Sequence, residues 1–187
     1  MAKIENIQVY GIEDSFKASK YPFAVNTDDV NSEITDKIRS LAKCEMGTGH
    51  DNFLNGIIVQ FDLTFSIKAW VESERYHFLD FVSSQSTMHC ISKMDIKAMC
   101  NDYVSDVVIA EAERLKQVYL NDKTPENYLK LLYNIPVGFE LTARMTTNYR
   151  QLKTIYNQRK THRLPDWHVF CDFIENLPYA KELICND

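Results

Sequence analysis

The chain has 187 residues, 45% of them apolar, with a net charge of −5 and no basic run longer than Arg-Lys. This length suffices for one domain or a tight two-lobed unit, and we expect a single α+β domain over residues 1–187. The acidic balance argues against bulk binding of nucleic acid, and no stretch approaches a membrane span. The N-terminus lacks an apolar signal region and the five cysteines form no C-x-x-C pair, so we expect a cytoplasmic protein with free thiols.

The first part of the chain predicts a strand, a loop and a helix. Residues 3–11 mix apolar and polar positions and predict the strand, whereas residues 12–26 read as a loop broken by a Tyr-Pro pair. Thr27, followed by two aspartates, predicts a helix N-cap, and the helix runs to about Cys44. Its apolar stripe has helical spacing: Val30, Ile34, Ile38 and Leu41.

Two long runs of alternating apolar and polar residues predict the main strands. The first covers residues 56–71 and the second residues 137–147. Strict alternation buries one face of a strand and leaves the other face polar, which is typical of antiparallel sheets. We therefore expect both runs to lie in one antiparallel sheet and to be its longest strands.

Helices account for most of the remaining sequence. Residues 72–82 are compatible with a short helix or with a turn and a strand. Asp95 is a candidate cap for a long helix that ends near Leu120. Thr124 followed by proline predicts a helix to about Tyr133, and two more helices are expected over residues 147–159 and from Pro165 onward. The sum is an α+β fold, a small antiparallel sheet with long strands covered by helices.

Two arginines on the helix at 147–159 are expected to point in different directions. The apolar face of this helix has spacing i, i+3, i+4: Leu152, Ile155 and Tyr156. Arg159 takes the next position on that face, where a guanidinium needs an anion unless it snorkels out. The anion could be an internal carboxylate such as Glu140, or a ligand. Arg150, nine residues earlier, lies about half a turn away in angle and should face outward.

Polar side chains also gather in two loop-like segments, 49–56 and 75–89. Their hydroxyl, amide and imidazole groups could cradle a small polar ligand or form solvated turns. The five histidines have no metal-ligand spacing, and no phosphate-binding glycine motif or nucleophile elbow occurs. We therefore expect no metal site.

Together these clusters resemble the flavin-dependent thymidylate synthases, over roughly residues 45–175. That family has a His-x-Thr-x-x-Glu run before a strand, and its three positions are here His50, Asn52 and Asn55. Its R-H-R motif and following Glu-x-Ser correspond to Arg75-Tyr76-His77 and Ser84-Gln85-Ser86. Its Asn-x-Arg motif and an arginine nine residues later are matched in identity and spacing by Asn148, Arg150 and Arg159. Pro136 and Asp166-Trp167-His168 extend the match.

The resemblance implies a cofactor, a substrate and a set of binding residues. FAD would be held by His50, Asn52, Asn55, Arg75, His77, Asn148 and Arg150. A pyrimidine nucleotide, dUMP or a variant, would be held by Ser84, Gln85, Ser86 and Arg159. Among these, Arg159 would polarise the pyrimidine ring, and Ser86 would bind without attacking. Methylenetetrahydrofolate and NADPH would be co-substrates of this thymidylate synthase reaction of nucleotide biosynthesis, in sites shared within a homotetramer.

Four positions depart from the family pattern. Met88 and Leu132 stand where the family has arginines that support the substrate phosphate, and Ser84 and Asn55 replace acids. Three interpretations therefore remain open: an active methylase of dUMP or a variant nucleotide, a catalytically inactive descendant that binds a nucleotide or mediates assembly, and an enzyme of unrelated fold. Flavin colour in the purified protein would favour the first.

Overall fold

The structure is a computed structural model, and it describes residues 2–45 and 47–185. Its centre is a four-stranded antiparallel sheet in the order β1-β2-β4-β3. The strands are β1 (Lys3–Tyr10), β2 (Ile58–Ser66), β3 (Asp80–Ser84) and β4 (Glu140–Asn148). β2 and β4 are the longest, with nine residues each, and they pair in unbroken register from Ile58–Asn148 to Ser66–Glu140. The predicted α+β class and the antiparallel pairing of the two long strands are confirmed.

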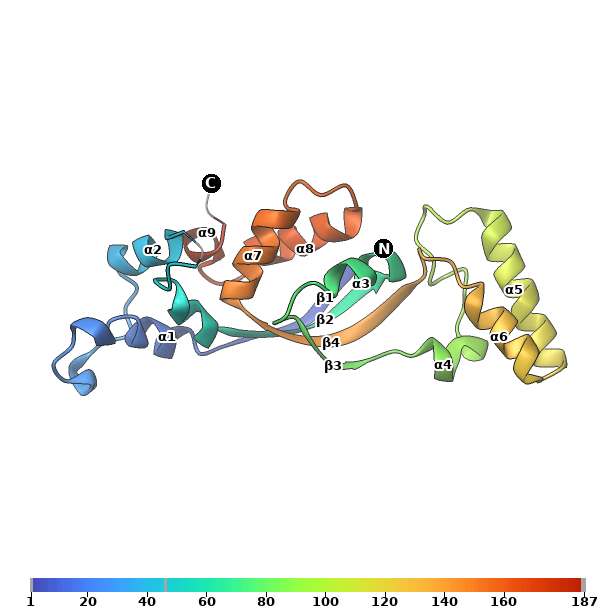
Figure 1. Cartoon of the computed structure of the whole chain (residues 1–187), viewed down its shortest axis with the longest axis horizontal. Coiled ribbons are helices and arrows are strands. Elements are labelled where there is room, and N and C mark those ends of the chain that lie inside the picture. The colour runs from blue at the N-terminus through green and yellow to red at the C-terminus, as the bar shows by residue number, and fades with distance from the viewer. Residues whose placement is uncertain (1, 46, 186–187) are drawn as a thin grey trace.

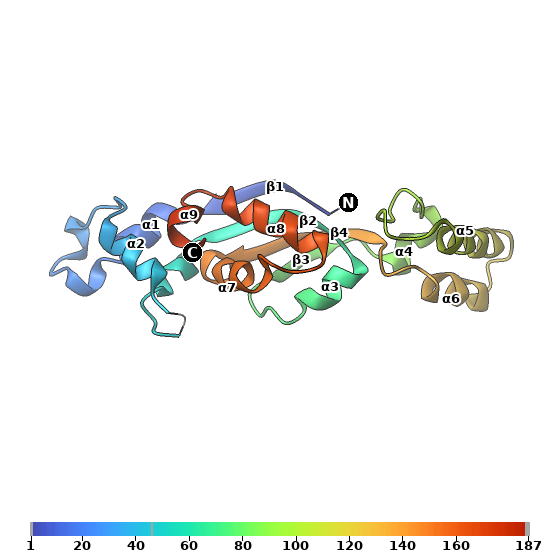
Figure 2. The ribbon, with the colours of Figure 1, turned by 90° about the horizontal axis from the view of Figure 1, so that it is seen from above.

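Helices cover one face of the sheet. α3 (Ile67–Ser73), α7 (Tyr149–Arg159), α8 (Pro165–Glu175) and α9 (Ala180–Leu183) lie on the same side of the strands (Figures 1 and 2). Every second residue of β2 is fully buried beneath them: Val59, Phe61, Leu63 and Phe65. Phe61 and Phe65 meet Phe170 of α8 at ring-centroid distances of 5.8 Å. Each fully buried large side chain contributes about 1.5–3 kcal/mol, so this layer holds α8 on the sheet.

The opposite face of the sheet is polar. Gln60, Asp62 and Thr64 of β2 alternate with the buried residues, and Arg144 of β4 donates to Asp62 Oδ1 at 3.3 Å. Thr64 and Thr142 form a cross-strand hydroxyl hydrogen bond of 2.7 Å. In the part of the chain that the structure describes, no helix lies over this face (Figure 1).

At one end of the sheet lie α1 (Ile12–Ala18), α2 (Asp36–Lys43) and three 3₁₀ helices, η1 (Tyr21–Phe23), η2 (Thr27–Asp29) and η3 (Asn52–Gly56). The loop predicted over 12–26 is therefore wrong, because Ile12 and Phe16 share a helical face and Phe16 is buried. The helix predicted from Thr27 is also misplaced. Its true cap is Thr35, whose Oγ1 accepts a hydrogen bond from the Ile38 amide at 3.3 Å.

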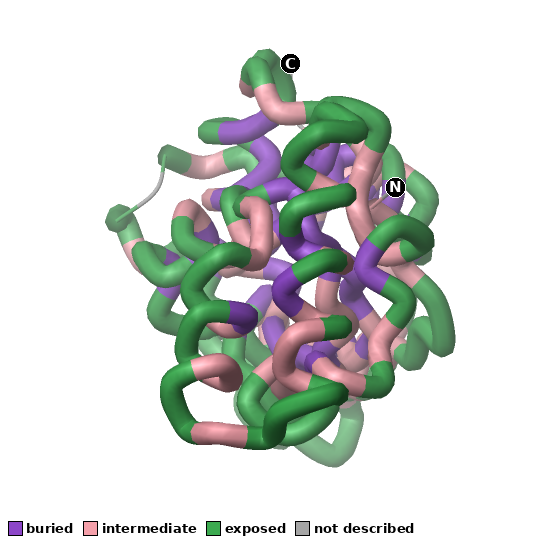
Figure 3. The backbone as a smooth tube through the Cα atoms, turned by 90° about the vertical axis from the view of Figure 1, so that its right-hand side faces the viewer, coloured by how far each residue is buried: buried purple, intermediate pink, exposed green. Residues whose placement is uncertain are grey.

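The other end is a helical arm, residues 87–133, which projects away from the rest, here called the body (Figure 1). It contains α4 (Thr87–Cys90), the 3₁₀ helix η4 (Ile91–Lys93), α5 (Asp106–Asn121) and α6 (Pro125–Tyr133). The arm packs around a separate hydrophobic core, to which the segment before β4 adds Phe139: Ile91, Ile96, Ala112, Leu115, Leu131 and Phe139. Figure 3 colours the chain by burial and shows the buried residues in the interior, surrounded by exposed residues.

Two boundaries differ from the sequence expectation for a local reason. The strand predicted over 56–71 stops at Ser66, which caps α3 by accepting the Ala69 amide at 3.2 Å. The long helix predicted from Asp95 begins only at Asp106, because residues 99–101 pair instead with the start of β4 through a bridge between Cys100 and Phe139. The predicted helix at 124–133 is confirmed as α6, and 147–159 as α7.

No helix within residues 2–45 and 47–185 combines the length and apolarity that a bilayer crossing requires.

Candidate functional site

The junction of β4 and α7 positions the first candidate residues. Asn148 ends β4 and caps α7, and its Oδ1 accepts a hydrogen bond from the Gln151 amide at 2.8 Å. The Tyr149 amide donates to Ile57 O at 3.0 Å, which ties the helix start to the beginning of β2. Arg150 therefore lies in the first turn of α7, where the helix dipole and free amides favour anions.

A fully buried carboxylate, Asp51, anchors Arg150. Arg150 Nε lies 3.1 Å from Asp51 Oδ1, and Lys153 Nζ lies 3.1 Å from Asp51 Oδ2. Lys153 also donates to the carbonyls of Ala42 at 2.7 Å and Cys44 at 3.1 Å, so its buried ammonium is fully satisfied. Arg150 makes only the Nε contact among the described residues, and its side chain is 33% exposed. Its two terminal nitrogens are therefore available to a ligand.

Arg150 and Asn148 line a small pocket of about 150 Å³, together with Gly47, Asn55, Phe78, Gln151 and Thr154. The structure thus brings together three of the seven residues expected at the flavin, namely Asn55, Asn148 and Arg150. The other four lie outside this lining. His50 and Asn52 are exposed just before Asn55, and Arg75 and His77 are exposed in the connection between α3 and β3, next to Phe78.

Arg159 lies on the buried face of α7, as its position in the apolar stripe predicts. Its Nη1 lies 2.9 Å from Glu72 Oε2 and its Nη2 donates to Glu72 O at 3.2 Å. Its Nε donates to Tyr76 Oη at 2.7 Å, and the guanidinium carbon lies 4.3 Å from the centre of the Trp167 ring. The carboxylate that meets Arg159 is thus Glu72 of α3, and the suggested Glu140 is wrong, because α3 folds back over β2 and brings Glu72 beneath α7.

His162 completes this buried charge cluster. Its Nδ1 accepts a hydrogen bond from the Leu164 amide at 3.2 Å, which leaves the proton on Nε2, 3.2 Å from Glu72 Oε2. Burial lowers the pKa of His162 and the charge of Arg159 lowers it further, with Glu72 opposing. For Glu72, burial raises the pKa, but the hydrogen bond from Lys68 and the charges of His162 and Arg159 outweigh burial, so its pKa is lowered.

The residues expected at the nucleotide lie elsewhere on the molecule. Gln85 is tied to β4, because its amide donates to Thr142 O at 2.9 Å and its Oε1 accepts the Thr142 amide at 2.8 Å. Ser84 and Gln85 line a hollow of about 320 Å³ beside Trp70 and Phe81. Ser86 precedes α4 as its cap residue. Within the described chain, neither Arg159 nor Arg150 lines this hollow.

Sequence reasoning missed Asp51, Lys153 and Glu72. Asp51 lies inside the polar segment 49–56, which is a candidate ligand loop by sequence, but the sequence does not indicate that Asp51 pairs with Arg150. Lys153 follows Arg150 by three residues and therefore shares its side of the helix, which is a usable signal for a common anion. Glu72 gives no local signal, because its partner is 87 residues away.

Comparison with solved structures identifies the fold. Flavin-dependent thymidylate synthase ThyX from Helicobacter pylori, complexed with FAD and dUMP, superposes with a TM-score of 0.76 over 97% of both chains at 11% identity. A second structure of that enzyme with FAD and dUMP gives 0.77 at 13% identity, over 98% of this chain and 97% of the other. The chain has the fold of the flavin-dependent thymidylate synthases.

The same thymidylate synthase fold links the chain to a second enzyme. The UMP/dUMP methylase PolB from Streptomyces cacaoi, bound with 5-Br dUMP, has a TM-score of 0.66 and 16% identity over 94% of this chain and 88% of that chain. No protein-family model and no curated protein sequence matches the chain. At such low identities the agreement concerns the fold, so the site residues have to be argued from their own geometry.

Proposed function

We propose that the protein binds FAD and a pyrimidine nucleotide and is a divergent methylase of that nucleotide, dUMP or a variant. The observation that carries this proposal is the half-satisfied guanidinium of Arg150. Asp51 fixes its Nε, while its two terminal nitrogens make no hydrogen bond among the described residues, and Arg150 lines the pocket together with Asn148 and Asn55. A fixed guanidinium at a helix N-terminus is suited to the phosphate or ring oxygens of a flavin nucleotide.

The residues present fit part of FAD. Arg150, Asn148 and Asn55 supply hydrogen-bond donors, and Phe78 supplies an apolar wall. The pocket of about 150 Å³ is smaller than the roughly 300–1,000 Å³ of a site that encloses a whole ligand. A second copy of the chain would complete it, which agrees with the expected homotetramer.

When bound, FAD would supply the hydride chemistry, with methylenetetrahydrofolate as the one-carbon donor and NADPH as the reductant. The protein's own part is positioning. Asp51 holds Arg150 in one orientation, and the salt bridge of Asp51 to Lys153 holds that carboxylate in place. Arg159 would act on the pyrimidine only if its guanidinium were freed from Glu72.

A second function is favoured by the state of Arg159. Its guanidinium is buried, and Glu72 and Tyr76 together engage its three nitrogens. Met88 and Leu132 stand where phosphate-binding arginines are expected. These features support a catalytically inactive protein that keeps a nucleotide or flavin site and acts in binding or assembly.

The test begins with flavin binding. Purified protein reconstituted with FAD should show the flavin absorbance at about 450 nm, and Arg150→Ala should weaken FAD binding. The variant should keep its fold, because Lys153 still neutralises Asp51. Lys123→Ala, which removes an exposed cation on the arm, is the matched control. Equal FAD affinity in Arg150→Ala and the parent would remove the flavin assignment.

A methylation assay separates the two functions. The protein is incubated with FAD, NADPH, methylenetetrahydrofolate and either dUMP or UMP, and the 5-methyl product is measured. Turnover supports the methylase. Flavin binding without turnover on either nucleotide supports the inactive binding protein.

A further inference from the structure

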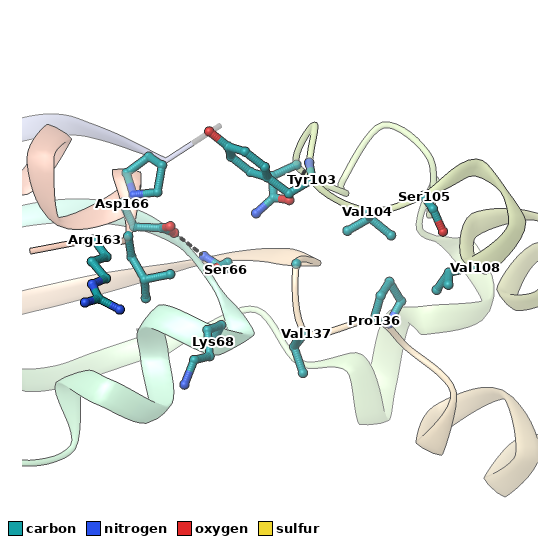
Figure 4. A pocket seen from close by; sticks show the side chains of 14 residues that line it. Ser66, Lys68, Tyr103, Val104, Ser105, Val108, Pro136, Val137, Arg163 and Asp166 are labelled. Carbon is teal, nitrogen blue, oxygen red and sulfur yellow. Dashed lines mark hydrogen bonds between the residues drawn. The ribbon is translucent and has the colours of Figure 1, made fainter.

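A cleft of about 700 Å³ lies between the body and the arm, away from the Arg150 pocket, and shares no lining residue with it. Its two walls differ in character (Figure 4). One wall, formed by the arm and by the segment 136–138 that leads from the arm into β4, is here called the arm wall. It is mostly apolar, with Tyr103, Val104, Val108, Pro136 and Val137. The body side carries charge, with Lys68, Arg163 and Asp166. The volume falls in the range of about 300–1,000 Å³ that is typical of sites for small ligands.

The floor of this cleft is fixed by backbone hydrogen bonds that the segment 137–139 makes with the body and with the arm. The amides of Ile67 and Lys68 donate to Phe139 O and Val137 O, each at 2.9 Å, and the Asn101 amide donates to Gly138 O at 3.0 Å. Gly138 leaves no space beneath the arm wall, since a Cβ there would lie 2.5 Å from Val104 Cγ2. The walls are therefore held at a set separation, and the site is largely preformed.

The arm wall of the cleft exposes large apolar side chains to solvent. Tyr103 is 80% exposed and Val137 is 64% exposed, although both lie at the cleft. Contiguous apolar surface of this kind on a folded protein marks a place where something binds. An apolar ligand body laid along this wall would remove it from water.

The body wall determines the charge of the ligand. Arg163 is exposed and forms no ion pair among the described residues. Lys68 is paired with Glu72, with its Nζ 3.4 Å from Glu72 Oε1. Asp166 is buried and its Oδ1 accepts the Ser66 amide at 3.0 Å. The guanidinium of Arg163 is therefore the charge of this wall that lacks an ion-pair partner among the described residues, so the wall is complementary to an anion.

We infer that this cleft binds a small amphipathic carboxylate, with its apolar body against Tyr103, Val108 and Val137 and its anionic head at Arg163. A long-chain alcohol would fit the wall and lack the head contacts, and a bare inorganic anion would lack the body contacts. The ligand class follows from having both walls in one cleft, and it does not depend on the flavin proposal.

The test uses octanoate as the probe and octanol as its neutral match. Methyl groups of valine are labelled in the full-length protein and followed by NMR during titration. Octanoate should shift the signals of Val104, Val108 and Val137 saturably, and octanol should bind more weakly. Arg163→Gln should weaken octanoate binding by roughly tenfold to a hundredfold, the range for a charge-assisted hydrogen bond, and should leave octanol binding unchanged.

Two further variants make the outcome decisive. Val108→Trp fills the cleft from a partly exposed position on α5 and should abolish the shifts. Lys123→Gln carries the same charge change as Arg163→Gln at a site outside the cleft, and should leave them intact. The inference is overturned if octanoate produces no saturable shift, if Arg163→Gln binds octanoate like the parent, or if exposed methyl groups all over the protein shift alike. Arg163 is exposed, so the result does not rest on Val108→Trp folding.

Discussion

Two arginines of the same helix differ in how far the protein itself satisfies them. Arg159 gives all three nitrogens to Glu72 and Tyr76 and lies over Trp167. Arg150 gives only Nε, to Asp51. A guanidinium saturated in this way contributes to the fold, whereas one that is half satisfied and partly exposed still has nitrogens that can donate to a ligand. At the residue scale, this difference supports a structural role for Arg159 and the proposed binding role for Arg150.

Replacing Arg159 should therefore destabilise the protein. In Arg159→Leu the Glu72 carboxylate, whose side chain is 18% exposed, loses its buried partner. Breaking such a pair costs about 3 kcal/mol, which urea unfolding would measure. The double variant Glu72→Gln/Arg159→Leu should recover much of the loss, because no charge is left stranded. Unchanged or increased stability in the single variant would mean that Arg159 serves a ligand and not the fold.

The same cluster should make stability depend on pH. The folded-state pKa values of His162 and Glu72 are both lowered, so the unfolded chain binds more protons in each window. The contributions of both groups to the free energy of unfolding are fully present above about pH 6.5, the ordinary pKa of histidine. It should fall as the pH drops toward the folded pKa of His162, and fall again below the ordinary glutamate value of 4.5. Unfolding free energies measured across this range test it.

His162→Asn isolates the histidine contribution. An asparagine oxygen can still accept the Leu164 amide, which His162 Nδ1 accepts at 3.2 Å, but it does not titrate. The first loss of stability should disappear and the second should remain. A pH profile of stability identical to that of the parent would show that His162 does not cause the loss of stability at the higher pH.

At the scale of elements, the start of α7 has a role in folding and also lines the proposed binding pocket. Asn148 ends β4, caps the helix through Gln151 and lines the Arg150 pocket. The cap occupies its side-chain oxygen, and its side-chain nitrogen donates no hydrogen bond among the described residues. One residue therefore links the register of the sheet to the geometry of the site.

Substitutions at Asn148 can separate these two roles. Asn148→Ala should lower stability by about 1 kcal/mol, because a helix cap is lost, and should also weaken FAD binding. Asn148→Asp keeps an oxygen that accepts the Gln151 amide, so stability should be preserved while FAD binding falls through loss of the donor and added negative charge. Thermal unfolding and flavin titration measure the two effects. Full FAD binding by Asn148→Asp would exclude Asn148 from the flavin site.

At the scale of the whole molecule, the chain has surfaces that its own helices leave uncovered. The edge strand β3 is exposed along its length, with Phe81 and Val82 each more than half exposed, and Phe78 lies just before it. An exposed edge strand with apolar side chains favours association with another chain. The small size of the Arg150 pocket points the same way.

A homotetramer therefore stays a prediction, with a specific test. Sedimentation should show a species of about four times the chain mass of 21.8 kDa, and Val82→Asp should shift it toward smaller species. Val25→Asp, at a fully exposed position near η1, is the control for added charge. A parent protein that sediments as a monomer, yet binds FAD, would show that one chain completes the site.

The sequence by itself determined the alternation of β2 and β4, the inward position of Arg159, the capped start of α6, the helix α7, and the motif spacing that predicts this fold. These features depend on periods of two or 3.6 residues and on local caps, so they can be read from neighbouring residues. Only the tertiary structure decided that Glu72 meets Arg159, that Asp51 anchors Arg150, and that residues 95–105 join β4 and form no helix. Those outcomes depend on contacts between distant segments, where buried charges and backbone groups must find partners that local sequence does not specify.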